Sequence, residues 1–179
     1  YFVGLWEKKF PADQLVFRNL SETHIPHIDA TTIQSFYTEE SDLSEVQKQS
    51  LQLSDSLIQE IMAADVLLFV CPMYNFTITS SLKAYFDLVA RVGKTFEYSN
   101  NGPVGLVHDK KTFVITTRGG YYVDHPDDMQ EPYFKIMLRF LGIEDLIFFH
   151  ADGVDISAES LEKGMASARA SIDTVFENL

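Results

Sequence analysis

Cysteine, basic side chains and long apolar runs are all scarce in this chain of 179 residues. The only cysteine, Cys71, has no partner for an internal disulfide, which suits a reducing compartment such as the cytoplasm. Lysine and arginine number 14 against 26 acidic residues, and the formal net charge of −12 leaves no basic face for a phosphate backbone. No apolar run reaches the roughly 18 residues that a transmembrane helix needs. The sequence therefore argues against nucleic acid and membrane as partners.

The length and the 46 % hydrophobic share predict a single domain, residues 1–179, whose core needs no disulfide or metal. The first residues, YFVGLWEKKF, look like the end of an amphipathic helix, because basic residues occupy the last turn and no start signal precedes them. We therefore expect a strand, a loop and a helix start upstream that the given sequence does not include.

Apolar runs of strand length and amphipathic helices alternate along the rest of the chain. Continuous apolar runs predict strands covered on both faces at 66–71, 111–117 and 146–150, and a further short strand is predicted at 13–20. Helical spacing of apolar residues predicts helices over 53–63, 78–89, 129–140 and 161–175, with Thr77 or Thr79 capping the second. Residues 21–49 predict a polar loop with some helix, and the Asn-Gly pair within 93–108 predicts a hairpin.

This alternation predicts an α/β fold, a three-layer α/β/α sandwich around a parallel sheet. With the strand expected upstream, the sheet would have five strands, the flavodoxin-like count, for which the strand order is 2-1-3-4-5. Ligands of such sheets bind outside the carboxyl ends of the strands. The residues directly after each apolar run are therefore the candidate site.

Two segments that follow buried strands have the composition of a ligand site. The first, Pro72–Phe76, reads Pro-Met-Tyr-Asn-Phe and is called the aromatic ledge below; the second, Arg118–Tyr122, reads RGGYY and is called the glycine loop. The ledge offers flat apolar surfaces, and paired glycines let the backbone approach a ligand closely. Together they favour a planar heteroaromatic such as an isoalloxazine. The alternative for either segment alone is ordinary packing or a plain turn.

The other reactive side chains favour structural roles. Cys71 lies in a buried strand without an adjacent base, which favours a structural residue over a nucleophile. His150 ends a strand at the same sheet edge, and a hydrogen-bonded structural histidine is favoured over a ligand contact. His24 and His27 have no third ligand nearby in sequence, which favours a solvated loop over a metal site. The stretch 124–128, DHPDD, predicts an acidic helix start.

The residues from Pro72 onward resemble a known family. The stretch PMYNFTITSSLKAYFDLVARVGKTFEYSNNGPVGLV, followed by KTFVITTRGG, is similar to the FMN-dependent NADH-azoreductases, bacterial NADH:quinone oxidoreductases of the flavodoxin-like quinone reductase superfamily. The similarity covers essentially the whole chain. It implies a homodimer with one FMN per subunit and active sites at the dimer interface. It also implies NADH-driven two-electron reduction of quinones and azo compounds, with the hydride carried by the flavin N5 and by no catalytic side chain.

The resemblance also implies roles for individual residues. The isoalloxazine would be lined by Pro72, Met73, Tyr74, Asn75 and Phe76, with Asn75 and backbone amides at its polar edge. The loop on the pyrimidine side would consist of Thr117, Arg118, Gly119 and Gly120. The substrate pocket would include Tyr98, which would reach the flavin of the other subunit, together with Tyr122 and Phe140.

Two departures from the family pattern stand out. Tyr122 occupies a position where many family members have histidine. The family binds the FMN phosphate in a serine-rich loop at a helix N-terminus, and that loop would precede Tyr1. NADH is predicted as the donor rather than NADPH, because the binding-edge loops supply only Arg118 for a 2′-phosphate.

Alternatives to an enzyme are an electron-transfer flavodoxin on the same fold and a non-catalytic interaction domain. The excursion at 93–108 favours the enzyme, since a flavodoxin needs only an exposed flavin edge. A dimer is also predicted from Leu82, Tyr85 and Phe86, which give the helix after the ledge more apolar surface than one stripe needs.

Overall fold

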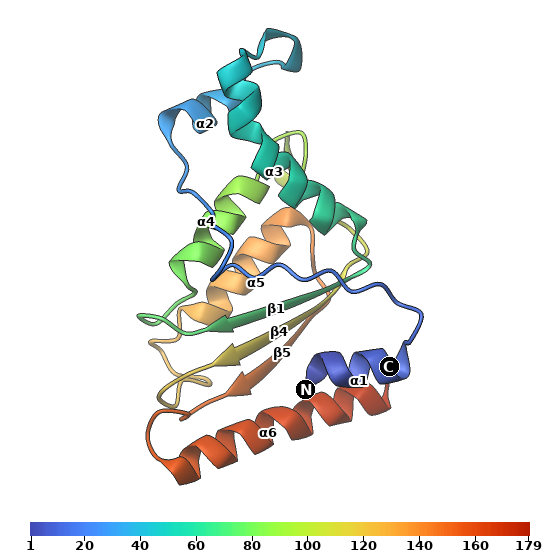
Figure 1. The fold of residues 1–179 in the computed structure, drawn as a ribbon. Coiled ribbons are helices and arrows are strands. Elements are labelled where there is room, and N and C mark those ends of the chain that lie inside the picture. Colours follow the sequence, from blue (N-terminus) through green and yellow to red (C-terminus); the bar gives the residue numbers. More distant parts are fainter.

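The computed structural model describes residues 1–179 as a parallel sheet with helices on both faces (Figure 1). The central strand, β4 (Lys111–Thr117), pairs in parallel with β1 (Val66–Pro72) on one side and with β5 (Leu146–Ala151) on the other. The order β1-β4-β5 corresponds to the last three positions of the order predicted from the sequence. The predicted α/β sandwich with a parallel sheet is therefore confirmed.

The helices form two layers, one on each face of the sheet (Figure 1). One layer consists of α3 (Glu45–Ala63), α4 (Ser80–Val89) and α5 (Gln130–Leu141). The other consists of α1 (Phe2–Lys9) and α6 (Ala158–Glu177). The short helices α2 (Ala30–Phe36) and η1 (Glu40–Asp42) lie near the start of α3, away from the sheet. None of the helices combines the length and the apolar character needed to cross a bilayer.

The sheet separates two hydrophobic cores. Val114 belongs to the larger core, with Phe134 and Leu138 of α5, whereas its neighbour Phe113 belongs to the smaller core under α1 and α6. Successive residues of a strand point to opposite faces, so a strand with a core on each side needs apolar residues throughout. This accounts for the continuous apolar runs in the sequence.

The strand predicted at 13–20 is wrong. Residues 13–19 belong to no sheet and run between α1 and α2 as an unpaired segment (Figure 1). The outer edge of β1 is unpaired, since β1 pairs only with β4, and in the predicted order 2-1-3-4-5 the segment 13–20 is not the neighbour of this strand. The open side of β1 leaves Val70 66 % exposed. The sheet therefore has three strands, one fewer than the four that the sequence predicts within this chain.

Several element boundaries also differ from the predictions. Helix α3 begins at Glu45, eight residues before the predicted start, because Ser44 and Gln47 form a capping box. Thr79, and not Thr77, caps α4 by accepting a hydrogen bond from the Leu82 amide. Strand β1 includes Pro72, although the sequence predicts its end at Cys71. The next amide, of Met73, points at β4, so the missing N–H of Pro72 faces the open edge, where a proline is tolerated.

The surface proposed for dimer formation is also wrong. Leu82, Tyr85 and Phe86 are all buried within the chain, between α4 and the larger core. The helix buries a wider face than one stripe because α3 and α5 flank it as well as the sheet. These three side chains therefore leave no apolar surface for a second subunit.

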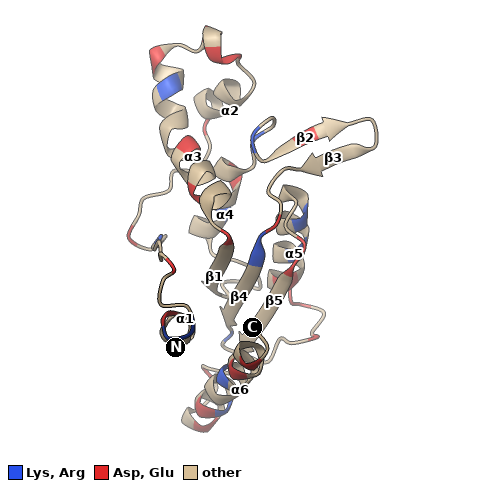
Figure 2. Ribbon diagram, turned by 90° about the vertical axis from the view of Figure 1, so that its right-hand side faces the viewer, with Lys and Arg blue, Asp and Glu red and all other residues tan.

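The predicted hairpin is confirmed as β2 (Phe96–Ser99) and β3 (Gly102–Gly105), which are antiparallel. Figure 2 shows it projecting from the body beyond one end of α5. Its base is held there because the Val107 amide donates to the Leu141 carbonyl at 2.9 Å. Gly105 and Gly142 pack backbone against backbone at this point, and Gly142 also ends α5 with a φ of +100°.

Replacing Gly142 by alanine is expected to lower the free energy of unfolding by about 1–3 kcal/mol, because the new Cβ is strained at positive φ. That Cβ would also lie 2.9 Å from the Gly105 carbonyl carbon. The matched control is Gly4→Ala in α1, where no atom lies within 4 Å of the new Cβ. This control should raise stability by about 0.5–1 kcal/mol. Urea unfolding measures the stability of both variants. Equal changes would contradict the inference that Gly142 is required by its positive φ and its close contact with Gly105.

Candidate functional site

Parallel pairing brings the aromatic ledge and the glycine loop together at one edge of the sheet. Pro72 is aligned with Thr117, and the Met73 amide donates to the Thr117 carbonyl at 2.8 Å. Farther out, the rings of Phe76 and Tyr122 meet edge to face with their centroids 6.1 Å apart. Two segments that lie more than 40 residues apart in the sequence therefore form one surface.

The ledge ends in a tight turn with unusual backbone angles. Tyr74 and Thr77 exchange two backbone hydrogen bonds of 3.0 and 3.1 Å, and the residues between them, Asn75 and Phe76, have φ values of +49° and +71°. Positive φ at both central residues defines a type I′ turn, which favours Asn-Gly. Asparagine tolerates this conformation, but a phenylalanine is strained in it. Such strain is found mainly at functional positions.

This turn presents both aromatic and polar groups to the outside. The side chains of Tyr74 and Phe76 are 60 % and 51 % exposed, so neither is ordinary core packing. The backbone amides of Asn75 and Phe76 donate to no other group of the chain. The ledge therefore offers apolar faces and hydrogen-bond donors side by side, which fits the rim and face of a flat heteroaromatic ring.

The glycine loop is held from one side by the segment after β5. The amides of Gly153, Val154 and Asp155 donate to the carbonyls of residues 120, 118 and 119, at 2.8, 3.1 and 3.1 Å. The amides of residues 119–121 donate to no group of the chain. A Cβ on Gly119 would lie 3.3 Å from the Cβ of Asp155, so the loop packs closely there. The carbonyls of residues 118–120 are therefore used within the chain, whereas the amides of residues 119–121 are available to a ligand.

The side chain of Arg118 points into the protein and not toward this surface. It is fully buried and lies within ion-pair distance of Asp128 and Asp152. Any contact of residue 118 with a ligand must therefore come from its backbone.

His150 is held by hydrogen bonds on both ring nitrogens. Nδ1 lies 2.7 Å from the Thr116 hydroxyl, and Nε2 lies 2.8 Å from a carboxylate oxygen of Glu131. Burial, together with the nearby positive charge of Arg118, lowers the pKa of His150 below its ordinary value. The ring is therefore neutral at pH 7, with Nε2–H donating to Glu131 and Nδ1 accepting from Thr116. This arrangement agrees with the structural role favoured by the sequence.

Glu131 and Cys71 are two further titratable groups near the edge. Burial acts to raise the pKa of Glu131, but Lys135, His150 and Arg118 together lower it, so the carboxylate is charged. Burial raises the pKa of the Cys71 thiol, which is therefore protonated at neutral pH. A buried thiol in this form is a poor nucleophile, as the sequence predicts.

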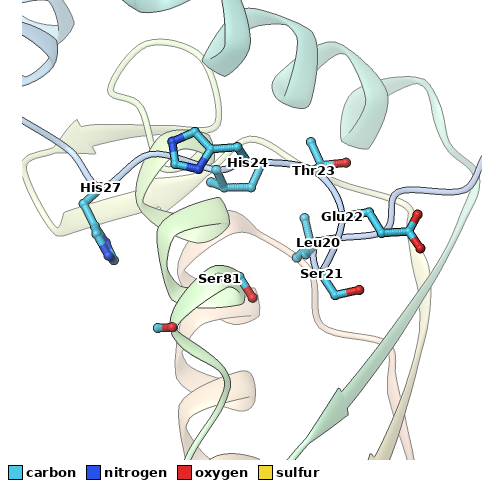
Figure 3. Close-up of a pocket in the computed structure, with 9 residues that line it drawn as sticks. Leu20, Ser21, Glu22, Thr23, His24, His27 and Ser81 are labelled. Carbon is cyan, nitrogen blue, oxygen red and sulfur yellow. The ribbon is translucent and has the colours of Figure 1, made fainter.

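His24 and His27 lie beside a separate hollow of about 410 Å³. Residues 20–25, His27 and the first turn of α4 line this hollow, and Figure 3 shows the two imidazoles pointing in different directions. No group of three or more histidine, cysteine or carboxylate side chains is gathered where it could hold a metal ion.

Two of the three residues predicted for the substrate pocket lie far from this edge within one chain. Phe140 packs against Phe96 with ring centroids 4.5 Å apart, and Phe96 in turn contacts Tyr98 at 5.5 Å. This cluster lies at the end of α5, whereas Tyr122 lies near its beginning. The 12 residues of α5 span roughly 18 Å, so one chain does not bring Tyr98 and Phe140 to Tyr122.

The arrangement of strands, helices and edge loops matches a family model. A model described as the flavodoxin-like fold matches residues 1–176. The chain belongs to this flavodoxin-like family. The FMN-dependent NADH:quinone oxidoreductase of Escherichia coli strain K12 is 43 % identical over 175 residues, which cover 98 % of this chain and 87 % of that protein.

Solved structures agree with this assignment. The crystal structure of azoreductase AzrA superimposes with a TM-score of 0.90 at 27 % identity, covering 99 % of this flavodoxin-like chain and 88 % of the other. An azoreductase from Bacillus anthracis strain Sterne gives 0.86 at 26 % identity, covering 98 % and 86 %. The family resemblance inferred from the sequence is confirmed.

Four polar residues around the edge of this flavodoxin-like protein were not predicted from the sequence as site residues. They are Asp128, Gln130, Glu131 and Asp152. Asp152 directly follows β5, and the rule that residues after a buried strand form the site would have found it. Asp128 lies in the predicted acidic helix start and accepts the amides of Gln130 and Glu131 at 2.8 and 3.2 Å. The predicted helix start is therefore confirmed. The ion pair of Asp128 with Arg118 could not be predicted, because no periodic pattern in the sequence indicates it.

The strain at Phe76 can be measured with two variants that both remove its ring. Phe76→Gly is expected to be more stable than Phe76→Ala by about 1 kcal/mol, because only glycine adopts the left-handed conformation without steric cost. Chemical unfolding of the two variants gives this difference. If alanine were the more stable, as it is at most positions, the turn would not be strained.

Stability should fall as the pH is lowered through 6.5. Above that pH, His150 is neutral in both the folded and the unfolded protein. Below it, the unfolded chain binds a proton at His150, whereas the folded protein does not, because burial lowers the pKa of the ring there. Proton binding therefore favours the unfolded state. The loss should continue until the pH reaches the folded pKa. Urea midpoints between pH 7.5 and 5.5 test this. His150→Gln should show a shallower pH dependence than the parent protein, and identical slopes would exclude His150 as the cause.

Proposed function

We propose that this flavodoxin-like protein is an FMN-dependent NADH:quinone oxidoreductase that also reduces azo compounds. The observation that carries the proposal is the single surface formed by the aromatic ledge and the glycine loop, with donor amides on both. The similarity to a quinone oxidoreductase at 43 % identity supports it, as does the likeness to two azoreductase structures. Quinones and azo compounds are flat conjugated molecules that fit the same surface.

The residues at the edge fit the isoalloxazine ring of FMN. Tyr74 and Phe76 supply exposed apolar faces, and the side chain of Asn75 supplies a polar group beside them. Amide donors of the turn at 75–76 and of the loop at 119–121 would meet the acceptor atoms of the ring's polar rim. When bound, FMN supplies the acceptance of hydride and its delivery as two electrons.

The chain's own residues bind, orient and shield the reactants. Pro72 and Met73, with Tyr74 to Phe76, would form one wall of the slot, and Thr117 to Gly120 would form the wall on the pyrimidine side. Tyr122 meets Phe76 edge to face and would exclude water between the walls. No side chain is required to act as a nucleophile, in keeping with the protonated, buried thiol of Cys71.

We further propose that the active form is a homodimer in which Tyr98 and Phe140 of one subunit complete the pocket of the other. The position of these two residues at the far end of α5 supports this, because within one chain they have no access to the edge. Tyr98 is 69 % exposed on a projecting hairpin, which is an unfavourable place for an aromatic ring in a monomer.

NADH is the proposed electron donor, as the name of the Escherichia coli relative indicates for that protein. Discrimination against NADPH is supported by the charges at the edge. A 2′-phosphate needs a free arginine or lysine, whereas the guanidinium of Arg118 is buried against two carboxylates. A cytoplasmic location is proposed from the single buried thiol, which suits a reducing compartment.

The proposed function is tested by loading the purified protein with FMN and following NADH oxidation. We expect turnover with a benzoquinone and with an azo dye, and an NADH preference of at least tenfold over NADPH. An electron-transfer flavodoxin would bind FMN but would not oxidise NADH rapidly. An interaction domain would bind no FMN.

Replacing Asn75 by alanine is expected to weaken FMN binding by about 1–3 kcal/mol, the cost of leaving a buried polar atom of the ring unpaired. The fold should remain intact. Asn75→Gly is the matched control for backbone strain, since it keeps the positive φ and loses only the side chain; it should weaken binding to a similar extent. Flavin fluorescence titration gives both values. Parent-like affinity in both variants would show that the ledge contributes only packing.

Replacing Tyr98 by alanine should leave FMN affinity nearly unchanged and raise the KM for the acceptor. The reason is that the ring is expected to reach the substrate side of the flavin in the partner subunit. Tyr98→Phe keeps the ring and should behave like the parent. Steady-state kinetics and flavin titration separate the two parameters, and a large loss of FMN affinity in Tyr98→Ala would contradict the assignment.

A further inference from the structure

Arg118 is the largest side chain that is completely excluded from solvent in this acidic protein. Full burial of a guanidinium is unfavourable unless carboxylates neutralise it and its donors have acceptors. Arg118 also belongs to the glycine loop, whose backbone faces the proposed flavin. A buried cation at this position needs an explanation that the packing of an ordinary core residue does not provide.

The guanidinium contacts side chains from the start of α5 and from the segment after β5, and Gln130 connects it to β1. Nη2 lies 2.9 Å from Asp128, before α5, and Nη1 lies 3.6 Å from Asp152, after β5. Nε donates to the side-chain oxygen of Gln130 at 3.2 Å, and the amide group of Gln130 donates to the Cys71 carbonyl in β1 at 3.1 Å. One cation therefore links β1, β4, the segment after β5 and the start of α5.

The two carboxylates that pair with Arg118 also accept hydrogen bonds from backbone amides. Asp152 uses its second oxygen to accept the amides of Tyr122 and Val123 at 2.7 and 2.8 Å. Asp128 uses its second oxygen to accept the amides of Gln130 and Glu131. Each carboxylate thus joins Arg118 to a stretch of main chain, and the stretch at 122–123 completes the glycine loop.

Charge attraction also holds Arg118, Asp128 and Asp152 together. The two aspartate side chains are almost as buried as Arg118 itself. Nη1 and Nη2 are at ion-pair distance without forming aligned hydrogen bonds, so the attraction is mainly between charges. Without the cation, two buried carboxylates would repel each other, and the segments that carry them would separate.

We propose that Arg118 and Asp152 are positioning residues that set the glycine loop in its ligand-binding conformation before the cofactor arrives. Arg118 holds Asp152, Asp152 holds the amides of Tyr122 and Val123, and the donors at 119–121 are thereby kept opposite the aromatic ledge. The assignment rests on the proposed flavin site for its purpose, but the restraint itself is a property of the cofactor-free chain.

The first test is amide hydrogen exchange in the FMN-free protein. In Arg118→Met, the amides of Tyr122 and Val123 should exchange at least tenfold faster than in the parent, while the Val114 amide in β4 stays protected. Arg169→Met, on the exposed face of α6, removes the same charge and should change neither. Exchange at 122–123 equal to that of the parent would overturn the proposal.

The second test is flavin binding. Arg118→Met should bind FMN at least tenfold more weakly than the parent and leave the ratio of kcat/KM for NADPH and NADH within twofold of the parent. FMN affinity within twofold of the parent would overturn the positioning role. A selective loss of NADPH use would show instead that the guanidinium contacts the donor's phosphate.

Asp152→Asn provides the same tests if Arg118→Met does not fold. It keeps the size and an acceptor oxygen and removes only the charge that pairs with Arg118. Faster exchange at 122–123 with a protected core supports the proposal, and unchanged exchange overturns it. A parent protein that binds no FMN would refute the proposed function, and the exchange result would still decide the role of the pair.

Discussion

The parallel pairing of β4 with both of its neighbours is the constraint on which the rest of this structure depends. Because the three strands run in the same direction, all of them end at one edge, and Pro72, Thr117 and Ala151 lie side by side. Parallel strands also require crossover connections, and these place helices on both faces of the sheet. At the edge where the strands end, backbone groups leave the ladder and become available to a ligand.

The edge is built against the local preferences of its sequence. A phenylalanine occupies a left-handed turn position, two aromatic side chains remain exposed, and a guanidinium is completely buried. Each of these features is unfavourable for folding by itself. The two hydrophobic cores, with their continuous apolar strands, provide the stability that lets the edge retain these features. Such conflicts are expected where a surface is organised for binding and not for packing.

Helix α5 connects two regions that have different roles in the proposed enzyme. Its first turn carries Gln130 and Glu131, which support the edge, and its end at Gly142 holds the hairpin with Tyr98. A single chain therefore holds the proposed cofactor surface at one end of α5 and an exposed aromatic at the other. In the proposed homodimer, this separation would let each subunit contribute residues to two active sites.

The α/β architecture and the two candidate binding segments could be predicted from the sequence. Continuous apolar runs at 66–71, 111–117 and 146–150 specify strands covered on both faces, and the motifs after the first two are specific enough to identify the family. These signals are local, since they depend on periodicity and on residues adjacent in the chain.

The contacts between residues that are distant in the sequence could be read only from the folded chain. Residues 13–19 have strand-like composition, but they pair with no strand, and the outer edge of β1 stays unpaired. Leu82, Tyr85 and Phe86 have the pattern of an interface, but flanking helices bury them within the chain. Arg118 has the position of a ligand contact, but Asp128 and Asp152 neutralise it inside the protein. No pattern along the chain predicts which distant charge or strand a residue will meet, because that depends on how separate segments pack in three dimensions.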